Sequence, residues 1–185
     1  MMLSIEAYTG VARRAELLVS EAGMQAIFAR LASEITATLA GKDPLVLCIM
    51  TGGVVAVGQL LPRLDFPLRL EYLHATRYRE ETRGGGIVWH HRPTERIGGE
   101  HILVVDDILD EGITLDTVVS ACREDGALSV HSAVLVEKEK DRPVDVQADF
   151  VGVRLPNRYL YGCGLDYKGY YRNAPGIYAI ADEDV

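Results

Sequence analysis

Residues 101–115 constrain the fold more than any other part of the chain. Four apolar residues, 102–105, run directly into two adjacent acids, Asp106 and Asp107. An apolar run of this kind predicts a strand that is buried on both faces of a parallel sheet. The two acids then lie at the carboxyl end of that strand, which is the edge where open α/β sheets bind ligands. The segment therefore predicts an α/β domain and places its ligand site.

The loop after these acids combines groups that bind anions with further carboxylates. Asp110, Glu111, Gly112, Ile113 and Thr114 follow in order before a helix begins. Gly112 permits a tight turn, so that backbone amides from 110 to 114 point into one pocket at the helix N-terminus. A ribose phosphate needs both features, because its phosphate takes the amides and its hydroxyls meet the carboxylates, directly or through Mg²⁺. The alternative is a solvated strand end at which Asp110 only caps the helix.

Strands and helices alternate along the rest of the chain. Hydrophobic periodicity predicts helices at 21–39, 54–61 and 114–123, and strands at 44–50, 68–74, 101–105 and 130–136, with weaker strands at 150–153 and 177–180. Residues 77–96 are polar, rich in glycine and aperiodic, which predicts a long loop. This alternation predicts a mainly parallel, twisted sheet flanked by helices.

Composition limits the remaining classes of protein. The 185 residues, 48% of them hydrophobic, suit a single domain over 1–185. The net charge of −8 makes nucleic acid an unlikely partner, and the chain has no apolar run long enough for a membrane span. The three cysteines are widely spaced and the N-terminus lacks the pattern of a signal peptide, so we expect a cytoplasmic protein.

Two segments resemble a known family. Residues 104–115 resemble the phosphoribosyl-diphosphate signature of type I phosphoribosyltransferases, and residues 149–167 resemble the purine-binding region of hypoxanthine-guanine phosphoribosyltransferases. The resemblance covers roughly residues 44–180. It implies the type I phosphoribosyltransferase fold, with a core at about 40–148 and a small C-terminal hood at about 149–185 that part of the N-terminus could join. It also implies a homodimer or homotetramer.

The resemblance implies an Mg²⁺-dependent enzyme of purine salvage. Such an enzyme transfers the 5-phosphoribosyl group from 5-phosphoribosyl-1-diphosphate to N9 of hypoxanthine, guanine or both, which forms IMP or GMP and releases pyrophosphate. Asp110 matches the candidate general base that accepts the N7 proton. Asp106 and Asp107 match the acids that hold the ribose and, together with Asp166, the metal. Residues 110–114 match the turn that binds the ribose 5′-phosphate.

The same resemblance assigns a purine site to Lys138, Tyr159, Leu160 and Asp166. A lysine just past a strand, as at Lys138, donates to the purine 6-oxo group and disfavours the 6-amino group of adenine. From the residues alone, Lys138 could equally belong to a solvated run of charged residues. Lys140, in the same run, is the less suitable candidate to bind the base. Tyr159 matches the aromatic residue that stacks on the purine, and Leu160 the residue whose backbone meets the base edge.

Pyrophosphate contacts are implied at Thr51, Gly52 and Arg172. A strained or cis peptide bond precedes Thr51 in this family, and an arginine fork such as that of Arg172 suits phosphate oxygens. Thr51 departs from the family pattern, in which Lys or Arg is common. Arg77 and Tyr78 resemble the Ser-Tyr pair that opens the family's mobile loop, with Arg in place of Ser.

Other functions remain open at this point. A regulatory protein of the same fold would bind nucleotides and RNA, but the charge of −8 and the joint presence of Lys138 and Asp166 disfavour it. A transferase for xanthine, adenine or a pyrimidine is the other alternative. Lys138 argues against adenine, whereas the sequence does not separate xanthine from guanine. No histidine is assigned to the site, and His74, at a strand end, comes nearest to it.

Overall fold

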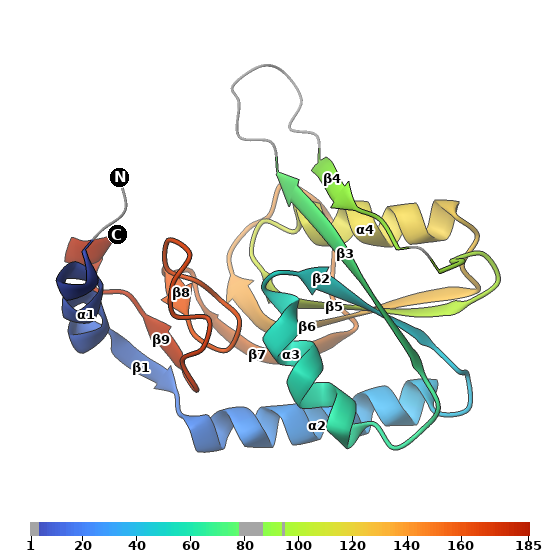
Figure 1. The fold of residues 1–185 in the computed structure, drawn as a ribbon, viewed down its shortest axis with the longest axis horizontal. Helices are drawn as coiled ribbons and strands as arrows, with labels where there is room; N and C mark the ends of the chain where they lie inside the picture. Colours follow the sequence, from blue (N-terminus) through green and yellow to red (C-terminus); the bar gives the residue numbers. More distant parts are fainter. Residues whose placement is uncertain (1–3, 78–86, 94) are drawn as a thin grey trace.

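The computed structural model describes residues 4–77, 87–93 and 95–185. Its centre is a six-stranded sheet with the strand order β4-β3-β2-β5-β6-β7 (Figure 1). The neighbouring pairs among β2, β3, β5, β6 and β7 are all parallel, and β4 pairs antiparallel with β3 at one edge. The strands are β2 (Leu45–Met50), β3 (Arg69–Arg77), β4 (Ile87–His91), β5 (His101–Leu109), β6 (Ser129–Glu139) and β7 (Phe150–Pro156). The predicted α/β class and mainly parallel sheet are confirmed.

Helices cover both faces of this sheet. One face packs against α2 (Glu21–Leu39) and α3 (Gly53–Leu60), and the other against α4 (Ile113–Glu124) (Figure 1). Because side chains alternate along a strand, β5 sends Leu103 and Val105 into the core with α2 and α3, and Ile102 and Val104 into the core with α4. The central strands are thus apolar on both faces, as a sheet covered by two layers requires.

A second, smaller sheet lies beside the central one. It consists of β1 (Glu16–Val19), β9 (Ile177–Ala179) and β8 (Leu160–Tyr161), all antiparallel. The helix α1 (Ile5–Arg14) packs on its tyrosine-rich side, so the first described helix and the C-terminal residues lie close together (Figure 1). Two short 3-10 helices, η1 (Leu61–Arg63) and η2 (Asp182–Asp184), complete the described elements. We call α1, β1 and residues 157–185 the hood.

Three features differ from the sequence-based expectations. The interval 77–96, predicted as a loop, contains β4, a short edge strand whose polar and aromatic residues do not alternate. The strands β5 and β6 run past their predicted ends, because backbone pairing continues through acidic and basic residues, as at Asp106 beside Val134. The N-terminal elements α1 and β1 carried no pattern that predicted them. Of the described helices, none is long and apolar enough to span a membrane.

The core of the central sheet gives a stability prediction. Leu103 is 1% exposed between β5 and the helices α2 and α3, so Leu103→Ala should lower the free energy of unfolding by about 2–5 kcal/mol. Leu128 is 67% exposed, and Leu128→Ala should change it by no more than about 0.5 kcal/mol. Urea unfolding followed by circular dichroism measures both variants. Equal losses would contradict the placement of Leu103 in the core.

Candidate active site

The acid pair lies inside the last part of β5 rather than beyond its end. Asp106 and Asp107 are each 8% exposed, and the backbone amide of Asp107 donates to Oδ1 of Asp106 at 2.9 Å. Burial raises the pKa of Asp106 well above its usual value, and the neighbouring charge of Asp107 raises it further. Burial raises the pKa of Asp107 as well. Two buried carboxylates side by side favour a ligand that brings positive charge or hydrogen-bond donors.

A tight turn connects these acids to α4. Gly112 has φ +82°, and a Cβ atom there would lie 2.5 Å from Val146 Cγ1, so both the backbone conformation and the space require glycine. The helix α4 begins at the next residue, Ile113. The predicted amide-rich turn therefore leads directly into a helix N-terminus, which favours an anion.

This turn forms one wall of a cavity of about 990 Å³. The other walls come from the loop after β2, from the end of β3 and from the hood. The lining residues are 49–52, 74–76, 106–115, Asp166 and Arg172. All the predicted ribose, phosphate and pyrophosphate residues from Thr51 to Arg172 thus surround one space at the carboxyl edge of the sheet.

A smaller cavity of about 310 Å³ adjoins the first. Asp107, Asp110 and Asp166 line both cavities, so the two cavities lie next to each other. The four residues predicted to bind purine converge on the smaller cavity with two aliphatic side chains. Its lining consists of Asp107, Ile108, Asp110, Lys138, Tyr159, Leu160, Leu165 and Asp166. The Tyr159 ring packs edge-on against the ring of Tyr167, with the centroids 5.4 Å apart.

Asp110 is held by two lysines. Lys138 Nζ donates to Asp110 Oδ2 and Lys140 Nζ donates to Oδ1, both at 2.9 Å. Partial burial alone would raise the pKa of Asp110, but the hydrogen bonds from Lys140 and Lys138 outweigh it and hold that pKa below its usual value. Asp110 is therefore ionised at neutral pH. Lys138 lies within β6, not just past the strand as expected, because its backbone still pairs beside Leu155 of β7.

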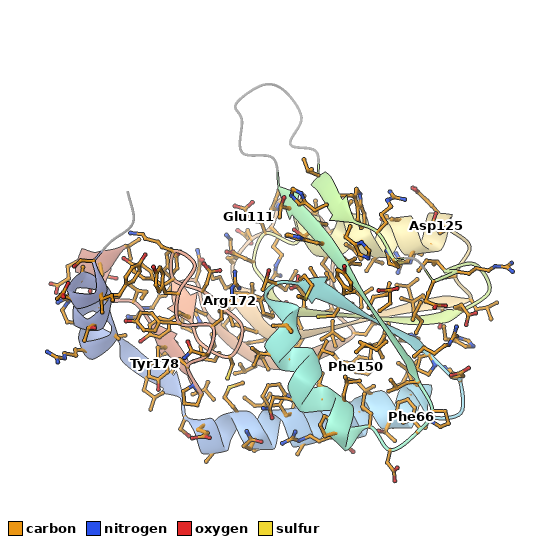
Figure 2. All side chains as sticks on the ribbon, viewed as in Figure 1. Phe66, Glu111, Asp125, Phe150, Arg172 and Tyr178 are labelled. Carbon is orange, nitrogen blue, oxygen red and sulfur yellow. The ribbon has the colours of Figure 1, made fainter. Side chains whose placement is uncertain are left out.

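Arg172 connects the hood to the acid pair. Its guanidinium lies 2.5 Å from Asp166 Oδ1 and 3.7 Å from Asp107 Oδ2, and it donates to the Gly164 carbonyl at 2.6 Å. Figure 2 shows Arg172 between the small sheet and the central sheet. The other oxygen of Asp166 accepts from the Gly169 amide at 2.7 Å. Arg172 thus neutralises part of the charge that the carboxylates collect.

The loop after β2 touches the same acids through its backbone. The peptide bond between Met50 and Thr51 is cis, as the family resemblance implies. A Cβ atom on Gly52 would lie 2.0 Å from Oδ2 of Asp107, so only glycine fits beside that carboxylate. A Cβ on Gly164 of the hood would lie 2.4 Å from the Gly52 carbonyl oxygen. The strand loop, the acid pair and the hood are therefore in direct contact.

Some site residues differ from the sequence-based selection. His74 and Thr76 line the larger cavity, since β3 is parallel to β2 and its carboxyl end reaches the same edge. Lys140 contacts Asp110, a contact that only the folded position of 140 beside the turn reveals. Arg77 is the last residue of β3, and Tyr78 lies outside the described residues. The sequence pattern at 68–74 could have suggested His74.

The oxygen ligands of the site fit a magnesium ion. Within the described part of the chain, no three His, Cys, Asp or Glu side chains converge on one metal position. Mg²⁺, however, usually takes only one or two protein carboxylates and completes its shell with water and substrate phosphates. Asp106 and Asp107 supply such oxygens, whereas Asp166 is paired with Arg172. The acid pair therefore suits Mg²⁺ that arrives with a phosphorylated ligand.

The fold and the site define a class of protein. The site combines three features: an acid pair near the end of a parallel strand, an amide-rich turn before a helix, and an arginine from the hood. Together they define an α/β protein whose site suits a phosphorylated sugar. The phosphoribosyl transferase domain family matches residues 16–168. The chain belongs to the phosphoribosyltransferase family.

Comparisons with individual proteins refine this family membership. The hypoxanthine-guanine phosphoribosyltransferase of Streptococcus pneumoniae strain R6 is 31% identical over 91% of this chain and 94% of its own. A crystal structure of a Staphylococcus aureus hypoxanthine phosphoribosyltransferase matches with a TM-score of 0.88 and 26% identity, over 99% of this chain and 98% of that one. A hypoxanthine-guanine-xanthine phosphoribosyltransferase structure matches with a TM-score of 0.83 and 28% identity, over 90% and 97% of the two chains.

The contact between Gly52 and the acid pair gives a prediction. Gly52 has φ −61°, which any residue tolerates, so Gly52→Ala tests only the space beside Asp107. We expect a loss of about 1–3 kcal/mol in the free energy of unfolding. Gly58→Ala in α3 meets nothing within 4 Å and should instead stabilise by about 0.4–1 kcal/mol. Chemical denaturation of both variants tests this, and a neutral Gly52→Ala would disprove the close contact.

Proposed function

We propose that the protein is a purine phosphoribosyltransferase. It transfers the 5-phosphoribosyl group of 5-phosphoribosyl-1-diphosphate to N9 of hypoxanthine, guanine or both, and so forms IMP or GMP. The observation that carries this proposal is the convergence of Lys138, Tyr159, Leu160 and Asp166 on one cavity, which shares Asp110 with the larger cavity. The names of the three similar proteins all include hypoxanthine, which supports a 6-oxopurine as the acceptor.

The larger cavity would hold the phosphoribosyl donor. Its 5′-phosphate takes the backbone amides of the turn from Asp110 to Thr114 at the start of α4. The ribose hydroxyls meet Asp106 and Asp107, and the pyrophosphate lies near Thr51, Gly52 and Arg172. Bound Mg²⁺ would neutralise charge on the pyrophosphate. Because Thr51 carries no charge, Arg172 is the arginine that the described lining of the cavity supplies to the leaving group.

The smaller cavity would hold the purine beside Tyr159. Lys138 donates to the 6-oxo group, and the backbone at Leu160 meets the base edge. The new bond forms between N9 and C1 of the ribose as the bond from C1 to pyrophosphate oxygen breaks. Asp110 accepts the proton that N7 loses, which its ionised state permits. The purine leaves the reaction attached to the ribose phosphate.

The hood would close the purine side of the site. The core of the one domain, expected at about 40–148, would also include α2 and β7, because both pack with the central sheet. We further propose a homodimer or homotetramer that works in the cytoplasm. Leu70 and Tyr72 on β3, 51% and 46% exposed, provide apolar surface for a second copy. Light scattering of the purified protein would show a dimer or tetramer, and a monomer would contradict this part of the proposal.

Direct assay with separate bases tests the function. With 5-phosphoribosyl-1-diphosphate and Mg²⁺, we expect nucleotide formation from hypoxanthine or guanine, none from adenine, and complete loss with EDTA. Adenine should not react, because its 6-amino group is a hydrogen-bond donor and offers the Lys138 ammonium no acceptor. Turnover of xanthine but not of hypoxanthine or guanine would show that the acceptor is xanthine, which is also a 6-oxopurine. Binding of the donor without turnover of any base, together with salt-sensitive RNA binding, would replace this proposal with the regulatory function.

The base role of Asp110 gives a further prediction. Asp110→Asn should lower kcat by about 10²- to 10⁴-fold, because the amide does not accept the N7 proton. The Kd for 5-phosphoribosyl-1-diphosphate, measured by calorimetry, should change far less, since the turn amides remain. Asp65→Asn, at an exposed position, is the matched control. Unchanged turnover of Asp110→Asn would remove Asp110 from the base role.

A further inference from the structure

Each carboxylate oxygen of Asp110 has a lysine of its own. Lys138 occupies Oδ2 and Lys140 occupies Oδ1, at equal distances of 2.9 Å. Neither lysine is free in solvent, since their side chains are 12% and 23% exposed. The Asp110 carboxylate is therefore held by two separate cations, one on each oxygen.

The two lysines differ in their position relative to the smaller cavity, the proposed purine site. Lys138 lines the cavity together with Asp110, whereas Lys140 reaches the carboxylate from outside that lining. A purine that enters the cavity with its 6-oxo group toward Lys138 competes with Asp110 for the same ammonium. Lys140 faces no such competition, because the base does not reach it.

The backbone around Lys140 is fixed from several directions. The Lys140 amide donates to the Lys138 carbonyl at 3.1 Å, which forms a turn at the end of β6. Arg142 donates to the carbonyl oxygens of Asp110, at 3.0 Å, and of Lys138, at 2.7 Å. Arg142 also lies 3.2 Å from Glu137 Oε1. The segment that carries Lys140 is thus tied to the backbone of Asp110 itself.

We propose that Lys140 is a positioning residue for Asp110. It holds the carboxylate through Oδ1, ionised and in a fixed orientation, while Lys138 turns to the 6-oxo group and Oδ2 becomes available to the N7 proton. This inference rests on the proposed function and adds to it a second lysine that does not touch the substrate.

The charges around Asp110 determine the sign of the expected effect. The charged and titratable groups that contact Asp110, pair with one of its partners or line its two cavities are Lys138, Lys140, Arg142, Glu137, Glu111, Asp106, Asp107, Asp166, Arg172, His74 and Tyr159. Once the purine engages Lys138, Lys140 is the remaining ammonium on Asp110. Its removal favours the protonated carboxyl, which does not act as a base. The acid limb of the kcat profile, where activity falls as pH falls, therefore moves to higher pH.

The test compares Lys140→Met with Lys140→Arg. Lys140→Met should lower kcat on the acid limb by about fivefold, the effect that one partly exposed ion pair produces, and should move that limb toward neutral pH. KM for 5-phosphoribosyl-1-diphosphate should stay the same. Lys140→Arg retains the charge and should restore the profile. Lys42→Met, at an exposed position outside the cavity linings, is the control and should match the unsubstituted protein.

A second readout does not depend on turnover. NMR titration of the ¹³C-labelled Asp110 carboxyl, assigned with Asp110→Asn, should give a higher pKa in Lys140→Met than in the unsubstituted protein. An unchanged carboxyl pKa together with an unchanged kcat profile would overturn the role of Lys140. Absence of turnover in the unsubstituted protein, with the carboxyl pKa still raised by Lys140→Met, would overturn the proposed function and leave the lysine contact established.

Discussion

The burial of two adjacent carboxylates in β5 is the constraint on which the site depends. Asp106 and Asp107 lie in a strand that is apolar on both faces up to that point, so water does not screen their charges. Their raised pKa values record the cost of this placement. Arg172 offsets part of that cost, but it does so from the hood and at 3.7 Å from Asp107. A cation or a set of hydroxyl donors at this position would stabilise the pair further, which makes the strand end a site for a polar ligand.

The hood follows from the same constraint. Arg172 reaches the acids because residues 160–180 lie beside the carboxyl edge of the central sheet, and N-terminal residues hold that segment in place. The strand β1 pairs with β9, Arg14 lies 2.5 Å from Asp184, and the Tyr167 hydroxyl donates to the Asp184 carbonyl at 2.8 Å. Tyr167 in turn packs against Tyr159 at the purine cavity. The N-terminal residues thus support the wall of a site that they do not themselves line.

The sequence predicted the central sheet well and the hood poorly, for physical reasons. Strands such as 44–50 are apolar throughout and the helix at 21–39 has a clear apolar face, so local pattern alone identifies them. The order of residues 102–114 likewise predicted a ligand site, because burial, charge and turn chemistry all appear in one short segment. Edge strand β4 and strand β1 are short, and neither has an alternating apolar pattern. The strand β4 depends on pairing with β3, and β1 depends on β9 at the other end of the described chain. The contact of Lys140 with Asp110 has the same origin, since it depends on how β6 lies beside β5.

Under the proposed function, the ion pairs across the two cavities would change partners when the two substrates bind. Arg172 bridges Asp107 and Asp166, and Lys138 holds Asp110, so each of the two cations with a proposed substrate role is held at the cavity wall by a carboxylate. A pyrophosphate that attracts Arg172 leaves Asp107 open to positive charge, and a 6-oxo group that attracts Lys138 leaves one oxygen of Asp110 open to a proton. Exchange of partners of this kind costs little reorganisation, because the charged groups stay near their positions and change only what they face. Asp107, Asp110 and Asp166 line both cavities, so under the proposed function these three acids would couple the binding of the sugar phosphate to the binding of the purine.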